Sequence, residues 1–474
     1  MLPHLERDLR QQLGAGKVAS DPLDLYVFGK DAGLVRGESS LIAFPTSTED
    51  VVTIARLAAR HGVPVIPRGS GTGLAGGVVA TGQALLMVTT RMNRIGEVDI
   101  ENRMVWVQPG VINQDLSTFT APLGLYFVPD PSSQSVCTIG GNVANNSGGL
   151  HCLAEGTTVN HVLAVEVVTA DGEVVVLGSS SPDPIGLDLR GVMVGSEGTL
   201  GIVTDVLVKL TPNPPAVRTL LLAFGSVEDA AATVSGIIAN GLVPGALEMM
   251  DRAMTQAVER FAHAGFPTEA EALLIAEVTG HPSAVDAEAD LIRRVGRSHS
   301  ATLIRVAVEE SERKRIWLGR KSAFGAIAQM NPDYYLHDTV VPRTRLVEAI
   351  KQVYVIGKRH GIPMLNVFHA GDGNLHPLMT FDASQPGVLD RVHAAGKDLI
   401  EACVAVGGSL SGEHGIGLEK RDYMPLIFDD VGLDAQARVR EAFDPEGRLN
   451  PGKILPEGSR CFDFGRPPPV GAWV

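Results

Sequence analysis

The stretch PRGSGTGLAGG, residues 67–77, decides the fold of this chain because of the pattern that precedes it. An apolar run at 41–44, an amphipathic stretch at 51–61 and a second apolar run at 63–66 predict a strand, a helix and a strand. Ser47 is typical of a helix N-cap at the start of the amphipathic stretch. The glycine-rich stretch is therefore expected to be a loop at the end of a strand.

This loop contains a literal G-x-G-x-x-G pattern in Gly71, Gly73 and Gly76, as do dinucleotide-binding turns. Such a turn must open a helix whose N-terminus faces the pyrophosphate, but residues 78–82, VVATG, are β-branched and broken by glycine. We therefore reject a Rossmann fold and NAD. The loop can still bind phosphate through converging backbone amides, with an ordinary glycine-rich turn as the alternative.

Two further glycine-rich segments follow, TIGGNVANNSGG at residues 138–149 and GSEGTLGIV at 195–203. Small side chains let the backbone approach a large flat ligand closely. Between these segments, two alternating runs around the Asp-Gly pair at 171–172 predict a β-hairpin. We expect each of the three glycine-rich loops to lie at the end of a strand and all three to hold one extended cofactor. A diphosphate nucleotide such as FAD fits this better than a compact ligand.

The segment TPNPP, residues 211–215, predicts a domain boundary, because consecutive prolines remove backbone donors and stop regular structure. After it, apolar strands at 219–224 and 272–278 alternate with helical stretches such as 227–240, which indicates an α+β fold. The predicted domains are residues 1–215, 216–420 and 421–474. We expect the proline-rich end of the last domain to be disordered.

Composition excludes several classes of protein. The chain has 474 residues, is 45% hydrophobic and carries a formal net charge of -14, so it can bury a large core and lacks the basic surface that nucleic acids or anionic membranes require. Its 4 cysteines form no C-x-x-C pair, which argues against an iron–sulfur cluster in this chain and favours a reducing, cytoplasmic setting. The N-terminus lacks the design of a signal peptide and no apolar run is long enough to span a membrane, so we expect any membrane association to come through a partner.

The segment NVFHAGDGNLH, residues 366–376, carries the sharpest chemical signal. If Asp372 and Gly373 form a two-residue turn, His369 pairs with His376 across a hairpin. Directly opposed Cβ atoms lie about 4.5–5.5 Å apart, so both imidazoles could reach one metal ion at about 2.0–2.1 Å. The alternative is one hydrogen-bonded buried histidine and one surface histidine.

A second unusual segment, SGEHGIG at residues 411–417, places a carboxylate beside an imidazole. Glu413 could complete a site of two histidines and one carboxylate, which leaves His414 as a base. A polar turn with two exposed side chains is the alternative. Earlier in the chain, Arg320 or Lys321 could hold a substrate carboxylate, since arginine offers a planar fork of donors.

Six motifs occur in order, and together they resemble the FAD-dependent 2-hydroxy acid dehydrogenases of the vanillyl-alcohol oxidase fold superfamily. They are PRGSGTGLAGG, TIGGNVANNSGG, GSEGTLGI, NVFHAGDGNLHP, SGEHGIG and FDPEGRLNPGK. Within that family the motifs are most similar to the flavin-binding D subunit of bacterial glycolate oxidases. The resemblance implies a two-subdomain FAD-binding domain of the vanillyl-alcohol oxidase or PCMH type, an α+β cap domain of the FAD-linked oxidase C-terminal type, and a last segment that returns to the first domain.

The resemblance also implies which residues contact FAD. They are Pro67, Arg68, Gly69, Ser70, Gly71, Thr72, Thr138, Gly141, Asn142, Asn145, Ser147, Glu197, Gly198, Ile202, Val203 and Asn450. Relatives that attach FAD covalently often carry a histidine in the first loop, where this chain has Ser70 and Thr72. We therefore expect FAD to be bound non-covalently.

The metal-dependent branch, typified by D-2-hydroxyglutarate dehydrogenase, implies His369, His376 and Glu413 as metal ligands. It implies His414 as the catalytic base and Arg320 as the arginine that binds the substrate carboxylate. The implied mechanism is coordination of the substrate by the metal, proton removal by His414 and hydride transfer from C2 to flavin N5. The ligand set fits zinc first, with manganese and iron also compatible.

The substrate specificity is expected to differ from that branch. Where hydroxyglutarate enzymes place polar groups near the distal carboxylate, this chain has Phe324, Leu336 and Leu378. An apolar pocket disfavours a second carboxylate, because an unpaired buried charge is costly. We expect glycolate or D-lactate as substrate, with D-2-hydroxyglutarate as the alternative.

Relatives of the glycolate oxidase type work with a second flavin subunit and an iron–sulfur subunit, so the resemblance implies such partners. It is also compatible with a cytoplasmic protein that meets the membrane through them. Two other classes stay open, a non-catalytic flavin subunit for electron transfer and a metal-dependent hydrolase. The hydrolase would leave the three glycine-rich loops unexplained.

Overall fold

The computed structural model describes residues 2–183 and 185–456, and these form two compact units. The first unit contains residues up to 147, 157–212 and the chain from 413 onward, and the second contains 148–156 and 213–412. The domain boundaries predicted from the sequence lie after residues 215 and 420. The proline-rich tail expected to be disordered, including Cys461, lies outside the described residues.

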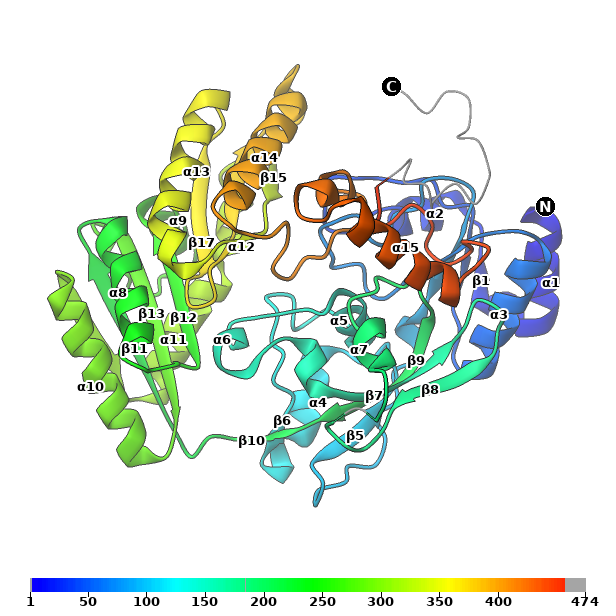
Figure 1. Ribbon diagram of the computed structural model, residues 1–474, viewed down its shortest axis with the longest axis horizontal. Coiled ribbons are helices and arrows are strands. Elements are labelled where there is room, and N and C mark those ends of the chain that lie inside the picture. The colour runs from blue at the N-terminus through cyan, green and yellow to red at the C-terminus, as the bar shows by residue number, and fades with distance from the viewer. Residues whose placement is uncertain (1, 184, 457–474) are drawn as a thin grey trace. The chain divides into compact units, whose positions relative to one another are not determined.

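The first unit holds two four-stranded sheets and a two-stranded one (Figure 1). Its elements are α1 (Leu2–Leu13), β1 (Val18–Ala19), α2 (Pro22–Phe28), β2 (Leu41–Ala43), α3 (Thr48–Arg60), β3 (Val65–Arg68), β4 (Leu85–Val88), β5 (Met104–Val107), α4 (Asn113–Thr120), β6 (Leu125–Tyr126), α5 (Ile139–Asn145), β7 (Val162–Val168), β8 (Val174–Gly178), α7 (Leu189–Met193), β9 (Ile202–Lys209), β10 (Thr211–Pro212) and α15 (Asp430–Phe443).

The first sheet has the order β1-β2-β4-β3, and β2, β4 and β3 run parallel. The predicted strand, helix and strand are confirmed as β2, α3 and β3. The Ser47 hydroxyl accepts a hydrogen bond from the Asp50 amide at 3.3 Å, so the predicted N-cap is also confirmed. Val51, Ile54 and Leu57 of α3 are buried against this sheet, because residues three and four apart share one helix face.

The second sheet, β5-β9-β7-β8, is antiparallel. Strands β7 and β8 form the hairpin predicted around Asp171, and Gly172 takes a positive φ of 75° in its turn. The chain returns to the first sheet at its end, where Leu449 bridges Val65 of β3 in parallel.

The second unit is built on one antiparallel sheet in which β14-β11-β13-β12-β17-β18-β16 are neighbours and β19 joins β17 to β15. Its elements are α6 (Cys152–Glu155), β11 (Ala216–Phe224), α8 (Val227–Ala239), β12 (Ala246–Asp251), α9 (Arg252–Ala262), β13 (Ala272–Gly280), α10 (Pro282–Ser298), β14 (Leu303–Ala307), α11 (Glu310–Lys321), α12 (Ala323–Ile327), β15 (Asp333–Leu336), β16 (Thr339–Val340), α13 (Leu346–His360), β17 (Met364–His369), β18 (Asn374–Leu375), β19 (Pro377–Phe381) and α14 (Val388–Ala405). The α+β organisation predicted for this region is confirmed.

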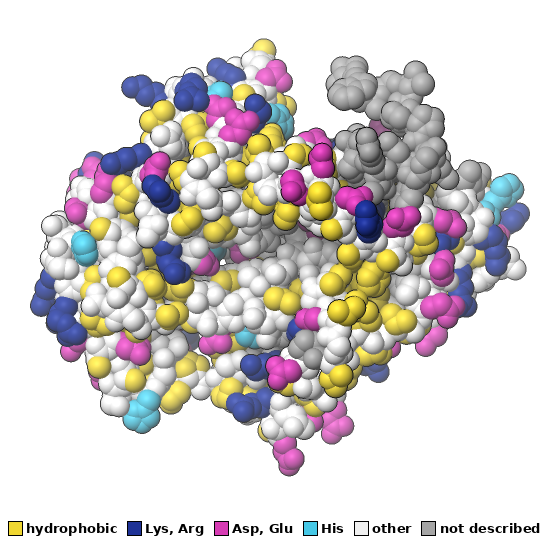
Figure 2. Space-filling view, viewed as in Figure 1, with side chains coloured by type: hydrophobic (Ala, Val, Ile, Leu, Met, Phe, Trp, Pro, Cys, Tyr) yellow, Lys and Arg dark blue, Asp and Glu magenta, His cyan; other side chains and the backbone are white. Residues whose placement is uncertain are grey.

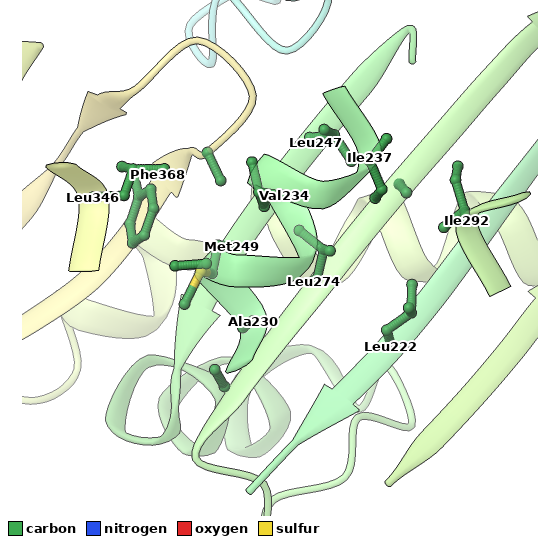
Figure 3. Close-up of a cluster of buried hydrophobic side chains, with 14 of the residues drawn as sticks. Leu222, Ala230, Val234, Ile237, Leu247, Met249, Leu274, Ile292, Leu346 and Phe368 are labelled. Atoms are coloured by element: carbon green, nitrogen blue, oxygen red, sulfur yellow. The ribbon is translucent and has the colours of Figure 1, made fainter. Parts of the chain in front are cut away.

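The core of the second unit lies on one face of this sheet. Figure 3 shows Leu222, Leu247 and Leu274 from three neighbouring strands directed toward the helices, with Val234 and Ile237 of α8 opposite them. Because strand side chains alternate between faces, the residues between these leucines point to the other face. That other face carries Thr219, Glu248, Glu277 and His369, and α11 contributes side chains to it.

The structure corrects one expectation about the glycine-rich segments. The first follows β3 as predicted, but the second forms helix α5, and the third precedes β9 rather than ending a strand. Helix α5 begins because the Thr138 hydroxyl accepts the Gly141 amide at 3.2 Å, a cap that a glycine count does not reveal.

On the face drawn in Figure 2, lysine and arginine side chains are scattered among acidic ones without forming a continuous basic stripe. None of the helices formed by the described residues is both long and apolar enough to cross a bilayer. The three cysteines within the described residues, Cys137, Cys152 and Cys403, are all free thiols.

Candidate functional site

The three glycine-rich segments of the first unit meet one another. A Cβ atom on Gly69 would lie 2.3 Å from Thr138 Oγ1, and one on Gly198 would lie 3.0 Å from Pro67 Cγ. Real side chains do not tolerate the first of these distances, so the segments approach as closely as they do only because of the glycines. The expectation that these segments gather in one place is confirmed.

The first loop presents groups suited to a phosphate. Within the described residues, the amides of Ser70, Gly71 and Thr72 donate no hydrogen bond to the protein, and neither does the buried Ser70 hydroxyl. Gly71 has a φ of 76°, which turns successive amides toward one side. Buried or crowded donors without partners are rare in folded proteins, so this loop fits the pyrophosphate of a dinucleotide.

Two residues expected at the cofactor have other contacts. Asn142, a residue of α5, is buried and accepts a hydrogen bond from Asn113 Nδ2 at 2.9 Å. Asn450 Nδ2 donates to the carbonyl oxygens of Gly77 at 2.8 Å and Glu197 at 2.7 Å, so it ties the end of the first segment to the third. Both side chains therefore bind other parts of the protein.

The Glu197 side chain binds backbone amides of a distant segment. Its two carboxylate oxygens accept hydrogen bonds from the amides of Ile416 at 2.7 Å and Gly417 at 2.8 Å. Burial raises the pKa of the Glu197 carboxyl to about 7, although these amides and the positive charge of Lys453 act to lower it. The segment that carries Glu413 and His414 is thereby fastened to the third glycine-rich segment.

In the second unit, the predicted hairpin register is wrong by two residues. His369 pairs with Asn374, and β17 continues with Asn366 opposite Pro377, so the loop spans residues 370–373 instead of two. A shift of two residues keeps each side chain on its face, whereas a shift of one would separate the histidines. His369 and His376 therefore still meet, with ring centroids 5.1 Å apart and planes at 86°.

Glu248 was missed by sequence reasoning. It lies opposite His369 on β12, and its Oε1 is 2.7 Å from His369 Nδ1. Since Nδ1 is engaged, Nε2 is the nitrogen of His369 that can bind a metal, and a carboxylate behind a ligating imidazole is a common support for such sites. The signal was available, because Glu248 is the one charged residue in the otherwise apolar run ALEMM at 246–250.

The choice between Arg320 and Lys321 is decided by burial. Arg320 is 4% exposed, whereas Lys321 is exposed at the end of α11. Both Nε and Nη2 of Arg320 contact Glu248 Oε2, at 2.9 and 2.6 Å. The Glu248 carboxylate thus links Arg320 of α11 to His369 of β17.

A second buried carboxylate, that of Asp338, holds the chain at residues 411 and 412. Asp338 accepts hydrogen bonds from the Ser411 hydroxyl at 2.5 Å and from the Gly412 amide at 3.1 Å. Glu413 is bonded directly to Gly412, so its backbone is fixed at the point where the chain leaves the second unit. The candidate ligand atoms of His369, His376 and Glu413 all lie within 4.8 Å of one another.

Comparison with known families places these features in context. The description "FAD binding domain" matches residues 39–178, and "FAD linked oxidases, C-terminal domain" matches residues 213–454. The second match alone covers about half of the chain and includes His369, His376 and Glu413. The chain belongs to the FAD-linked oxidases.

Curated relatives of this FAD-linked oxidase agree with that assignment. It is 46% identical to "Glycolate oxidase subunit GlcD" of Escherichia coli K12, over 90% of this chain and 85% of the relative. It is 38% identical to the protein of the same name from Bacillus subtilis, over 88% and 89%, and 34% identical to "D-lactate dehydrogenase" of Anaerostipes hadrus, over 91% of each.

Solved structures with the same fold include a 4-ethylphenol oxidase from Gulosibacter chungangensis and a p-cresol methylhydroxylase. Both give a TM-score of 0.82 at 20% and 16% identity, and the match covers 96% of this FAD-linked oxidase and 98% and 97% of those chains. The predicted fold class, an FAD-binding domain of the PCMH type with an FAD-linked oxidase C-terminal domain, is confirmed. The chain is an FAD-dependent oxidoreductase.

The apolar residues expected to select the substrate of this FAD-linked oxidase come from neighbouring strands and α12. Leu336 of β15 and Leu378 of β19 are direct cross-strand partners and are both buried. The ring of Phe324 lies 6.4 Å from that of Tyr334, which belongs to the same strand as Leu336. Thr380 pairs with Tyr334 on the same face of these strands and its hydroxyl is buried, so this region combines apolar side chains with a polar group.

Proposed function

We propose that this FAD-linked oxidase oxidises a small 2-hydroxy acid, glycolate or D-lactate, to the 2-oxo acid. The observation that carries the proposal is the approach of His369, His376 and Glu413 to within 4.8 Å, with Glu248 orienting one of the histidines and binding the arginine suited to an acid substrate. The names of the glycolate oxidase and D-lactate dehydrogenase relatives support the same class of substrate.

Two imidazoles and one carboxylate are a suitable donor set for a divalent metal, zinc first and manganese or iron as alternatives. A metal bound there lowers the pKa of the substrate hydroxyl, and bound FAD supplies the acceptor for the hydride from C2. His369 and His376 offer neutral nitrogens, and Glu413 offers a charge that balances the cation.

Arg320 binds the substrate carboxylate. Glu248 occupies the Nε and Nη2 positions, which leaves Nη1 to donate to a carboxylate oxygen. His414 accepts the hydroxyl proton, and its imidazole lies 3.9 Å from the Glu413 carboxylate. The residues Leu336 and Leu378 offer no partner for a second carboxylate, which favours glycolate or D-lactate over D-2-hydroxyglutarate.

The protein is proposed to bind FAD non-covalently, because Ser70 and Thr72 stand in the first loop where covalent relatives carry histidine. It is proposed to work with a second flavin subunit and an iron–sulfur subunit, since two of the relatives are themselves named as subunits. A cytoplasmic location, with membrane contact through those partners, is consistent with the absence of a spanning helix in the described residues.

The test is an anaerobic titration of the purified flavoprotein with glycolate, D-lactate and D-2-hydroxyglutarate while the flavin absorbance is followed, with metal analysis of the same sample. We expect bleaching by one of the first two acids and about one metal per chain. His414→Gln should abolish bleaching while FAD stays bound, and His369→Ala should lose the metal. Preference for the diacid would overturn the pocket argument, and no bleaching by any acid would favour the non-catalytic subunit.

A further inference from the structure

Residues 413–417 carry Glu413 and His414 in an irregular segment of the first unit. No helix or strand includes them, and Gly415 and Gly417 have φ values of 83° and 53°. A segment without its own hydrogen-bond ladder takes its shape from what it packs against. The conformation of residues 413–417 therefore depends on other residues of the first unit.

Each of the three glycine-rich segments supplies part of it. Asn145 Nδ2, from the second segment, donates to the His414 carbonyl at 3.0 Å. The Ala75 carbonyl, from the first segment, accepts hydrogen bonds from the amides of Leu418 at 2.9 Å and Glu419 at 3.2 Å. Glu197, from the third segment, binds the amides between these two points, at Ile416 and Gly417.

The residues around Glu197 are closely packed. A Cβ atom on Gly415 would lie 2.7 Å from Glu197 Oε1, and one on Gly417 would lie 2.0 Å from the Ala75 carbonyl oxygen. The carboxylate therefore touches the segment on the residue after His414 as well as through its two hydrogen bonds.

Glu197 is itself held in an unusual conformation. Its φ is 50°, which costs a non-glycine residue free energy, and its own amide and carbonyl are bonded to Ala144 and Asn450. Strain of this kind persists where the surroundings enforce it, and it is a frequent mark of functional sites. In this backbone conformation the Glu197 carboxylate binds the amides of Ile416 and Gly417.

We infer that Glu197 is a positioning residue, which fixes the backbone of His414 so that the imidazole is oriented for proton removal. The inference rests on the proposed function, because it takes His414 as the base. It gives the three glycine-rich segments a second role, since the parts of the chain suited to the cofactor also carry the base.

The test is a double-mutant cycle in the FAD-loaded protein. Glu197→Gln keeps the size of the side chain but turns one acceptor into a donor, so one of the two amides loses its partner. We expect the rate of flavin reduction at saturating acid to fall about 10–100-fold, the scale for a small misplacement of a catalytic group, with KM and flavin content unchanged. In a His414→Gln background the same change should cost about twofold or less, because its effect passes through the imidazole.

Asp251 provides the matched control. It is buried, and its two oxygens each accept one backbone amide, from Met254 and Asn366, both at 2.8 Å. Asp251→Asn should leave the rate of flavin reduction within about threefold while lowering stability by a similar amount to Glu197→Gln. An equal loss of rate in the control would overturn the inference.

Hydrogen exchange of the FAD-free protein gives a readout that does not depend on turnover. The amides of Ile416 and Gly417 should exchange faster in Glu197→Gln than in the parent protein and remain unchanged in Asp251→Asn. Additive losses in the cycle, loss of flavin, or unchanged exchange at these amides would each overturn the inference. Failure of the proposed function looks different, since no acid would then reduce the flavin of the parent protein.

Discussion

Glu248 in the second unit and Glu197 in the first are both buried carboxylates with partners on both oxygens, but the partners differ in kind. Glu248 binds the side chains of Arg320 and His369, whereas Glu197 binds the backbone amides of Ile416 and Gly417. On a sheet the ladder already fixes the backbone, so only the orientation of an imidazole needs support. In an irregular segment the backbone must be fixed first.

The largest expected effect tests how much each carboxylate stabilises its unit. Glu248→Ala leaves Arg320 buried without its counter-charge and should lower the free energy of unfolding by about 3–5 kcal/mol. Glu197→Ala removes two hydrogen bonds to amides and should cost about 1–3 kcal/mol. Urea denaturation of the metal-free and FAD-free proteins measures both, and equal losses would remove the distinction between the two carboxylates.

The next largest expected effect is on metal affinity, which should differ between the variants of the two carboxylates. Glu248→Gln weakens the hydrogen bond that orients His369 and should reduce affinity about 10–100-fold, since partners behind ligating histidines have effects of this size. Glu197→Gln removes no contact to a metal ligand side chain, and Asp338 still holds the Gly412 amide next to Glu413, so affinity should fall much less than in Glu248→Gln. Competition against a chelator of known affinity measures this, and a comparable drop in Glu197→Gln would show that the two carboxylates serve the same site.

Helix N-caps allow the same local interaction to be compared in the two units. The Ser47 hydroxyl accepts the amide of Asp50 at the start of α3, and that of Ser226 accepts the amide of Asp229 at the start of α8. Ser47→Ala and Ser226→Ala should each cost about 1 kcal/mol of stability. Thermal and urea unfolding measure the losses, and an effect on flavin reduction by either variant would contradict a purely local role.

The smallest effect is a dependence on pH at Asp205, which lies opposite Glu166 on neighbouring strands of the first unit. Burial raises the pKa of Asp205 to about 6, with Glu166 adding to the shift. A raised carboxyl pKa favours folding at low pH, and this contribution is lost as pH rises from about 4 through about 6. Asp205→Asn should therefore match the parent protein near pH 4 and be more stable by about 0.5–1 kcal/mol at pH 7, a range reduced for solvent screening.

Urea unfolding at a series of pH values follows this difference. The Asn side chain can still accept the Val206 amide that Asp205 accepts at 3.1 Å, so the comparison isolates the charge. A stability difference that does not change between pH 4 and pH 7 would show that folding does not raise the pKa of Asp205.

Local features of the fold followed from the sequence because they depend on neighbouring residues. The cap at Ser47, the turn at Gly172 and the alternation that places His369 and His376 on one face are all set within a few positions along the chain. The register of the histidine hairpin did not follow, because a four-residue loop and a two-residue loop preserve the same alternation. Pairing of β17 with β19 continues the register of the longer loop, and β17 also pairs with β12, which is distant in sequence.

The supporting residues of the site were the hardest to predict. Glu248 lies far from His369 in the chain, and only the sheet order brings them opposite one another. The family resemblance implied that Glu197 contacts the cofactor, and it gave no sign that the side chain bonds to a segment more than two hundred residues later. A lone charge in an apolar strand was the one available signal, and it applied to Glu248 alone.

The bridge between Val65 and Leu449 has a consequence for biosynthesis. Strand β3, which contains Val65, can pair with Leu449 only after the whole second unit has been synthesised. As the ribosome releases the chain from its N-terminus, the second unit can fold before the first is complete. The cradle proposed for FAD, closed by Asn450, would then be completed only after residue 450 has been synthesised, so that FAD is bound after the second unit has been made.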